Sequence, residues 1–198
     1  MFRAAINEIK TALILFLFLT LITGIIYPLV VTGLAQLLFP EQANGSLIKQ
    51  GDKTIGSLLI GQSFTDIKYF WGRPSATSPF PYNGVNSSGS NMGPSNPAFI
   101  KAVQDRVLVF RQFDTNTQSL IPVDLVTASG SGLDAEISPL AAYYQVPRIA
   151  TVRHLSADAL NNLIREQTRH RTFGILGEPR VNVLQLNRAL DQLGAKNG

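Results

Sequence analysis

The chain has 198 residues and a formal net charge of +4 at pH 7, from 17 basic and 13 acidic side chains. It has no cysteine, which excludes thiol catalysis and cysteine-based metal sites, and its two histidines, His154 and His170, are too few for most histidine-based metal sites. Because the charge is small and no basic stripe with interleaved aromatic residues occurs, we expect no nucleic-acid partner and no bound metal.

The first predicted element is a membrane-spanning helix, because Thr11 to Pro40 is one uncharged run dominated by Leu, Ile, Val and Phe. About 20 apolar residues allow a helix to cross the bilayer core, where a lone segment must be helical. The run is longer than the roughly 7–15 apolar residues of a cleaved signal, and no A-x-A site follows it. We therefore expect a permanent anchor over residues 11–39, with a kink at Pro28.

The orientation of this anchor rests on few charges. Arg3 and Lys10 precede the run, whereas Lys49 and Lys53 follow it closely, so the positive-inside count is nearly balanced. A short tail that stays inside is the simpler arrangement. We predict a cytoplasmic tail over residues 1–10 and an extracytoplasmic domain over residues 40–198.

One stripe of the anchor is predicted to contact other membrane helices. Thr20, Gly24, Tyr27 and Val31 recur at steps of three and four residues, which places them on one helical face. Small and hydroxylated residues on such a face allow another helix to approach closely, although a single-pass anchor tolerates them anywhere.

The exported part begins with a predicted hairpin and a long loop. Residues 46–49 and 54–60 are typical of two short strands around a turn at 50–53. Residues 72–97 are rich in Gly, Pro, Ser and Asn, and such long loops are usually functional or disordered. Because Phe80, Tyr82 and Met92 offer apolar anchors, we predict an ordered loop.

Helices follow, so the fold class is α+β. Residues 120–127 are predicted to form a strand, with Pro122 at an edge or bulge. The predicted helices begin at Pro97 with Asn96 as cap, at Pro139 with Ser138 as cap, after Ser156, and near Val183 with Gly194 as its end. Their apolar spacing predicts a single core that includes Phe99, Val103, Val107, Leu160, Leu163, Leu186 and Leu190.

No motif for catalysis is convincing. The stretch 51–54 (GDKT) resembles part of the phosphorylation site of P-type ATPases, but Ile55 replaces the required glycine and an ordinary turn explains it better. No P-loop occurs. A membrane-anchored serine hydrolase is the alternative function, with Ser129 or Ser131 as nucleophile, His154 as base, and Asp124 or Asp134 as orienting group.

Two groups of residues are candidates for binding an anion. The backbone amides of Ser129, Gly130, Ser131 and Gly132 could form a small nest or merely a flexible turn. Gln145 and Arg148 could bind phosphate if exposed, but a glutamine among apolar residues is usually a structural amide. On the structural interpretation, neighbouring side chains could still pack after Gln145→Ala.

Six segments together resemble one known family. They are IGQSF (60–64), YFWGRPSAT (69–77), GSNMGPSNP (89–97), LVTASGSGLD (125–134), ISPLAAYYQVPRIA (137–150) and VNVLQLNRAL (181–190). With the preceding anchor, the chain resembles the C subunit of the bacterial Kdp-type potassium-transporting ATPase over nearly its whole length.

This resemblance implies a non-catalytic accessory subunit in the bacterial inner membrane. Its implied partners are a potassium-translocating A subunit, an ATP-hydrolysing B subunit and a small F subunit. It has no cofactor of its own, and ATP belongs to the complex. The family's C subunit is described as a catalytic chaperone that assists assembly and raises the ATP affinity of the B subunit. The glutamine that aligns with Gln145 is the one proposed to meet nucleotide.

The residue-based prediction of topology conflicts with direct nucleotide contact. A periplasmic domain cannot reach a cytoplasmic nucleotide pocket, so its effect on ATP affinity would be coupling through the membrane. We expect such a domain to dock on the outside of the A subunit. In addition to the anchor stripe, Arg73, Asn91 and Asn96 in the long loop are candidate partner-binding residues.

The predicted anchor and its orientation can be tested on native membranes. We expect the full-length chain to remain in the membrane fraction after carbonate washing, because the apolar run is retained. Protease added to spheroplasts should digest residues 40–198, whereas protease added to inverted vesicles should leave them intact. A mature chain that begins near Glu41, or the reverse protease pattern, would contradict the prediction.

Overall fold

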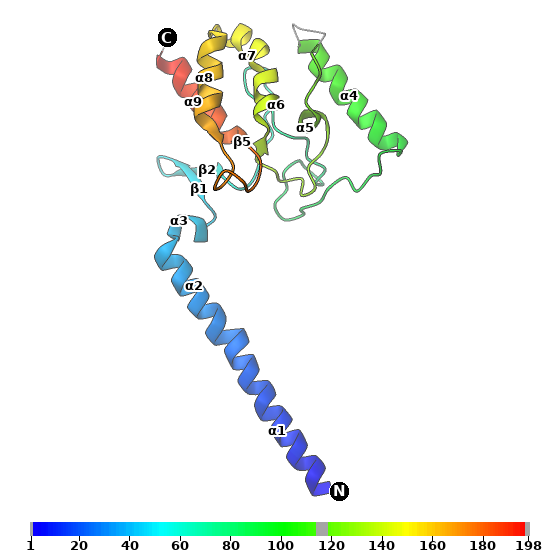
Figure 1. Cartoon of the computed structure of the whole chain (residues 1–198), viewed down its shortest axis with the longest axis vertical. Coiled ribbons are helices and arrows are strands. Elements are labelled where there is room, and N and C mark those ends of the chain that lie inside the picture. Colours follow the sequence, from blue (N-terminus) through cyan, green and yellow to red (C-terminus); the bar gives the residue numbers. More distant parts are fainter. Residues whose placement is uncertain (1, 114–118, 197–198) are drawn as a thin grey trace. The chain divides into compact units, whose positions relative to one another are not determined.

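The computed structural model describes residues 2–113 and 119–196. The chain divides after Leu47 into two compact units, which we call the helical unit (residues 1–47) and the α+β unit (residues 48–198). Figure 1 labels the elements of both units. The prediction of one long apolar helix followed by an α+β fold is confirmed.

The helical unit contains one helix that is long and apolar enough to cross a membrane. It consists of α1 (Phe2–Leu21), the π-helical η1 (Ile22–Ile26) and α2 (Tyr27–Leu38), and α3 (Pro40–Ala43) follows. The span Ala5–Leu38 has 34 residues, and its most apolar 18-residue window has a mean hydropathy of 2.6 and is not buried. These properties fit a membrane location.

The helix changes its winding immediately before Pro28. The N–H of Tyr27 donates to the carbonyl of Ile22, which is the five-residue step of a π-turn. Because proline lacks an N–H and its ring crowds the preceding turn, a wider turn there relieves the conflict. The structure thus shows a π-turn before Pro28, and the kink expected at Pro28 stays a prediction.

Two small sheets lie in the chain. The strands β1 (Leu47–Gln50) and β2 (Lys53–Ser57) pair with each other, as the predicted hairpin requires. The second sheet has the order β3-β5-β4 and is antiparallel, with β3 at Glu136–Ile137, β5 at Arg180–Asn182 and β4 at Thr168–Arg169. Val181 in the central strand is fully buried.

The α+β unit contains six helices in the described residues: α4 (Pro97–Phe113), α5 (Val123–Val126), α6 (Pro139–Tyr144), α7 (Val146–Arg153), α8 (Ala157–Gln167) and α9 (Val183–Lys196). Three predicted caps are confirmed. Asn96 accepts from the N–H of Ala98, and the hydroxyls of Ser138 and Ser156 accept from amides three residues onward.

Two predictions about local structure are wrong. Residues 120–127 do not form a strand, because α5 begins after Pro122 and the hydroxyl of Thr127 donates back to the carbonyl of Val123. Proline is tolerated at the start of a helix, and here it marks that start. Gly194 does not end α9, which continues to Lys196.

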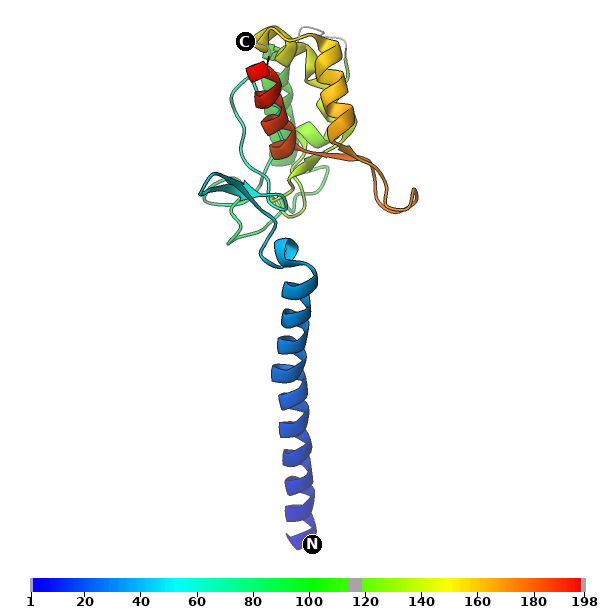
Figure 2. The same cartoon turned by 90° about the vertical axis from the view of Figure 1, so that its left-hand side faces the viewer.

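The core lies where α6, α7, α8 and α9 pack together over β5 (Figures 1 and 2). Leu160, Leu163, Leu186 and Leu190 are buried, as their spacing predicts. Val103 and Val107 are partly buried against this core, whereas Phe99 lies outside it. Between Ser57 and Pro97 the described chain forms no helix or strand, and this irregular segment, which includes the predicted loop 72–97, adds the deeply buried Phe70.

Of the three expected apolar anchors of the loop, Tyr82 is partly buried and the other two are exposed, and polar contacts also hold this irregular segment. Phe80 and Met92 are 56% and 43% exposed. The side-chain amide of Asn187 instead bonds both the N–H and the carbonyl of Phe70, at 2.8 and 2.9 Å. The hydroxyl of Ser75 accepts from the N–H of Tyr82. The loop is ordered, as predicted, but side-chain hydrogen bonds order it.

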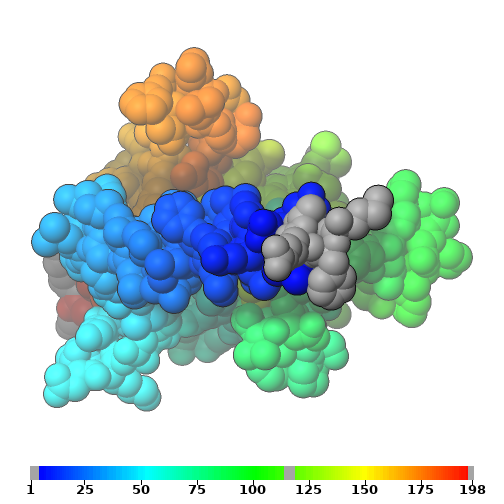
Figure 3. All heavy atoms as spheres, turned by 90° about the horizontal axis from the view of Figure 1, so that it is seen from below, coloured from blue at the N-terminus to red at the C-terminus, as the bar shows by residue number. Residues whose placement is uncertain are grey.

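A second hairpin stands out from the surface between β4 and β5. Figures 2 and 3 show it in orange. Thr172 and Leu176 form its bridge, and an ion pair between Arg171 and Glu178 closes its base. Phe173, at its tip, is 88% exposed.

The buried helical core can be tested by truncating one residue. We expect Leu190→Ala to lower the free energy of unfolding of the full-length chain by ~2–5 kcal/mol, because the side chain is fully buried and leaves a cavity. Urea denaturation in detergent would measure this loss. The control Leu108→Ala removes the same atoms from an exposed helix position and should change stability by less than ~0.5 kcal/mol. Equal effects of the two variants would contradict the assigned core.

Candidate functional site

Gln145 lies at the junction between α6 and α7, with its side chain 1% exposed. Its oxygen accepts from the N–H of Trp71 at 2.8 Å and from Arg148 at 2.7 Å. Its nitrogen donates to the carbonyls of Trp71 and Ala141, at 3.1 and 3.2 Å. These bonds use both acceptor and both donor positions of the amide.

Arg148 extends the same network to the preceding residues. Its guanidinium donates to the carbonyls of Ile67 and Tyr69, and it lies 4.2 Å from the ring centre of Trp71. Burial lowers the pKa of Arg148 to about 10, and the charge of Asp66 opposes that shift. The guanidinium therefore stays charged at neutral pH, with aromatic and carbonyl groups as its surroundings.

Together these two side chains form what we call the Gln145–Arg148 clamp, which ties residues 67–71 to the α6–α7 junction. The spacing of the pair places both side chains on the same side of the helix turn, as the sequence suggests. The structure adds that both are buried and fully engaged. In this arrangement the amide of Gln145 has no hydrogen-bonding capacity left for a nucleotide.

The segment 129–132 also makes contacts within the domain. Ser129 is buried, and its hydroxyl accepts from the N–H of Gly132, so that amide is not available to an anion nest. The carbonyl of Gly132 accepts from Ser75, and Ser87 donates to the carbonyl of Ser131. Gly130 and Ser131 remain exposed.

The segment requires a glycine at position 132. Its φ of +68° and the contacts that a Cβ would make, 2.5 Å from Thr77 and 2.6 Å from the carbonyl of Ser88, leave no room for a side chain. The segment therefore packs closely against the long loop.

The residues of the alternative hydrolase are hydrogen-bonded elsewhere. Ser131 accepts from the N–H of Leu133, Asp124 accepts from Ser138, and Asp134 is paired with Arg73. His154 is exposed at the end of α7 in the left-handed conformation. Within residues 2–113 and 119–196, no hydrogen bond links it to either serine, so the described structure does not assemble the triad.

The predicted partner-binding residues are of two kinds. Thr20, Gly24, Tyr27 and Val31 are all exposed along the apolar helix, and a Cβ at Gly24 would meet only Thr20, at 3.9 Å. The π-turn adds a residue between the two halves of the stripe, which offsets them by up to about 100°. In the loop, Asn96 caps α4 and Asn91 is exposed. Of these two asparagines, Asn91 is the one whose side chain makes no hydrogen bond within the described residues.

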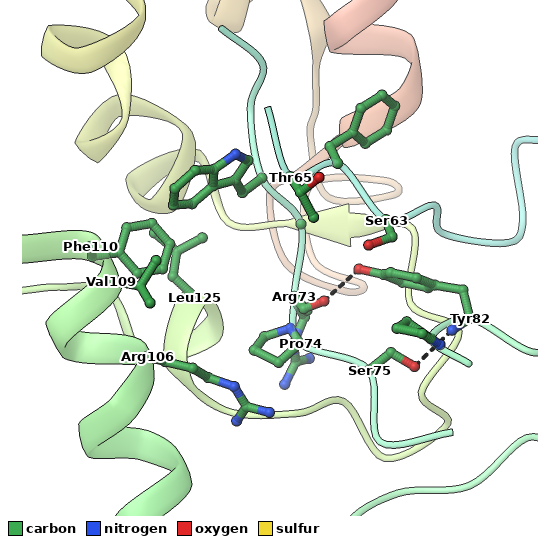
Figure 4. Close-up of a pocket in the computed structure, with 14 residues that line it drawn as sticks. Ser63, Thr65, Arg73, Pro74, Ser75, Tyr82, Arg106, Val109, Phe110 and Leu125 are labelled. Atoms are coloured by element: carbon green, nitrogen blue, oxygen red, sulfur yellow. Dashed lines mark hydrogen bonds between the residues drawn. The ribbon is translucent and has the colours of Figure 1, made fainter. Parts of the chain in front are cut away.

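A cleft with a volume of about 370 Å³ lies beside α4 and the residues that follow the clamp. Trp71 lines it, and Figure 4 shows Arg73, Tyr82 and Arg106 around it. The hydroxyl of Tyr82 donates to the carbonyl of Arg73. Burial raises the pKa of Tyr82 to about 12, and Asp134 adds to the rise, so this hydroxyl remains a donor at neutral pH.

The sequence reasoning missed Arg106. This residue lies between Val103 and Phe110 on the face of α4 that packs toward the core. Its burial lowers the pKa of its guanidinium. A charged residue on the apolar stripe of a helix is the signal that could have identified it. Among the described residues, no group of three His, Cys, Asp or Glu side chains could hold a metal ion.

The comparisons with known proteins identify the family. The model of the K+-transporting ATPase c chain, KdpC, matches residues 9–192. The chain belongs to the KdpC family. Two similar relatives, each named potassium-transporting ATPase KdpC subunit, come from Polynucleobacter asymbioticus (59% identity, 92% of this chain, 96% of the relative) and Methylococcus capsulatus (58% identity, 95% and 99%). A third, from Dechloromonas aromatica, is 56% identical over 93% of this chain and 97% of the relative.

KdpC membership confirms the resemblance drawn from the six segments, and it places the chain in a potassium-transporting ATPase complex. The anchor fits that setting, since KdpC is a subunit of a transport complex.

The structure of this KdpC chain changes the expectation for Gln145→Ala. We expect the substitution to lower the free energy of unfolding by ~1–3 kcal/mol, because the N–H of Trp71 and the guanidinium of Arg148 lose a buried acceptor. Urea denaturation followed by the fluorescence of Trp71, the single tryptophan, would measure the loss. Gln104→Ala, at an exposed position of α4, is the matched control. Indistinguishable unfolding of the two variants would show that the clamp is not structurally important.

Proposed function

We propose that this chain is a non-catalytic accessory subunit of the potassium-importing complex, which assists assembly and raises the ATP affinity of the ATP-hydrolysing B subunit. The observation that carries the proposal is the KdpC match over residues 9–192. Support for the absence of chemistry comes from the candidate catalytic side chains. Ser129, Ser131, Asp124 and Asp134 all bond to groups within the domain.

The proposed partners are the A, B and F subunits, and the proposed location is the bacterial inner membrane. In this arrangement the N-terminal tail is cytoplasmic and the α+β unit is periplasmic. The exposed apolar helix supports contact with partner helices, because the stripe around Gly24 carries no bulky side chain at that position.

For the effect on ATP affinity, we favour docking on the outside with coupling through the membrane. The four hydrogen bonds of Gln145 support this mechanism, because direct contact with ATP would require the amide to give up bonds to Trp71 or Arg148. Direct contact through Gln145, Arg148 and residues 129–132 remains the competing proposal. It requires both an opened clamp and a cytoplasmic domain.

The proposal predicts that weakening attachment of this chain also weakens ATP binding by the complex. We expect Gly24→Leu to reduce copurification of the other subunits, because a bulky side chain obstructs close helix packing. The apparent ATP affinity of potassium-stimulated hydrolysis should fall with it. Gly33→Leu is the matched control. A Cβ at Gly33 would meet no atom within 4 Å, and Gly33 lies two residues beyond Val31, away from the face shared by Tyr27 and Val31.

Three outcomes would each contradict one part of the proposal. Unchanged copurification and ATP affinity in Gly24→Leu would remove the role of that face. ATP hydrolysis by the purified chain alone, abolished by a single substitution, would show that the subunit is an enzyme. If Gln145→Ala lowers ATP affinity while assembly and stability are unchanged, direct nucleotide contact replaces indirect coupling.

A further inference from the structure

The cleft beside α4 has the size and the lining of a small-molecule site. Its volume of about 370 Å³ is within the usual range of roughly 300–1,000 Å³ for ligand pockets. Neither Gln145 nor residues 129–132 line it. It is therefore distinct from the residues proposed above to meet nucleotide.

Two arginines supply the charge of this cleft. Arg106 donates to the carbonyl of Val126 at 3.0 Å, and Arg73 donates to the carbonyl of Ala128 at 3.4 Å. Because Thr127 between them is extended, these carbonyls are separated by roughly 7 Å and both guanidiniums lie along the same short stretch of backbone. Figure 4 shows both side chains on the same side of the cleft.

Only one carboxylate balances these two charges. Asp134 pairs with Arg73 at 3.1 Å, and no acidic side chain lines the cleft. Arg106 has no acidic partner in the described ranges 2–113 and 119–196, where its bond to Val126 is to a neutral carbonyl. One positive charge in the cleft is thus uncompensated.

The cleft also retains unused hydrogen-bond donors. The Nε of Arg73 is buried and has no hydrogen-bond partner within the part of the chain that the structure describes. The hydroxyls of Ser63 and Thr65 line the opposite rim and are exposed. Because the Nε of Arg73 is buried, the hydroxyls of Ser63 and Thr65 are the accessible donors that the cleft offers beside its guanidinium groups.

The remaining walls are apolar and partly aromatic, with contributions from Phe64, Trp71, Val109, Phe110 and Leu125. Trp71 contacts Phe110 edge-on, at 5.2 Å between ring centres. A ligand with only an anionic group would pair with the arginines but leave these apolar walls exposed to water. A ligand with only an apolar body would cover the walls but leave Arg106 without an anionic partner.

From this combination we propose that the cleft binds a small organic anion, in which a phosphate or carboxylate group is attached to an aromatic body. The anionic group lies between Arg106 and Arg73, where charge-assisted hydrogen bonds hold it. The aromatic body lies against Trp71 and Phe110, in a geometry that aromatic rings favour. This site does not depend on the proposed accessory function, because no residue of the anchor lines it and neither does Gln145 or Arg148.

The single tryptophan makes the cleft directly observable. We expect phenyl phosphate to change the fluorescence of Trp71 saturably in the full-length chain in detergent. Inorganic phosphate and benzyl alcohol, which carry only one half of the ligand chemistry, should each bind at least about tenfold more weakly. Free N-acetyltryptophanamide corrects for quenching in solution.

Variants on α4 separate the charge from the apolar wall. Arg106→Gln should weaken phenyl phosphate binding at least about tenfold, because it removes the uncompensated charge. Lys101→Gln makes the same charge change on the same helix at an exposed ion pair, and it should leave the affinity unchanged. Val109→Phe fills the wall from a half-exposed position and should abolish binding without removing charge. Circular dichroism would confirm that each variant is folded.

Several results would overturn the proposal. These are the absence of a saturable response to phenyl phosphate, equal loss in Arg106→Gln and Lys101→Gln, or equal affinity for inorganic phosphate. If Arg106→Gln does not fold, Val109→Phe remains as the test. Phenyl phosphate binding that persists in Val109→Phe would also overturn the proposal. The short-chain lipid dihexanoyl phosphatidate tests a lipid headgroup as the ligand. If it binds more tightly than phenyl phosphate, the assignment of an aromatic anion is overturned.

Discussion

The buried amide of Gln145 is the contact on which the arrangement of the α+β unit depends. Between Ser57 and Pro97 the described chain forms no helix or strand, so its backbone groups cannot be satisfied by regular pairing. Buried backbone groups without partners are costly. Gln145 and Arg148 supply partners for Trp71, Tyr69 and Ile67, and Asn187 does the same for Phe70.

This clamp also determines the shape of the neighbouring cleft. Trp71 contacts the guanidinium of Arg148 and forms an edge-to-face pair with Phe110. Arg73 follows two residues later and reaches Asp134 from there. A shift of this segment would therefore move one wall of the cleft and one of its two guanidiniums. The clamp and the cleft are separate sites that share a single stretch of backbone.

Most of the polar side chains considered as candidate catalytic or binding groups instead make hydrogen bonds or ion pairs that stabilise the fold. Ser129 and Ser131 accept bonds from nearby amides, and Asp134 combines an ion pair with a bond to the N–H of Glu136. Such use is consistent with the accessory role proposed above. The exposed hairpin with Phe173 at its tip shows that apolar surface is nevertheless available on the outside of the unit.

The sequence by itself determined the elements whose signals are local. The apolar run predicts the spanning helix, Pro28 marks its irregular turn, and Ser138 and Ser156 mark helix starts, because each effect acts within one or two turns of backbone. The spacing of Leu186 and Leu190 predicts the buried face of α9 for the same reason. The family resemblance likewise depends on short segments that can be read directly.

Only the tertiary structure decided how the polar residues of the candidate site are used. Gln145 meets Trp71 from 74 positions away, and Asn187 meets Phe70 from 117 positions away, so no local pattern shows whether these amides are exposed or buried. The same holds for Arg106, whose bond to Val126 and place in the cleft depend on how α4 packs. Residues 120–127 were misjudged as a strand because a β-rich composition is a weak signal, which Pro122 and the packing of α5 override.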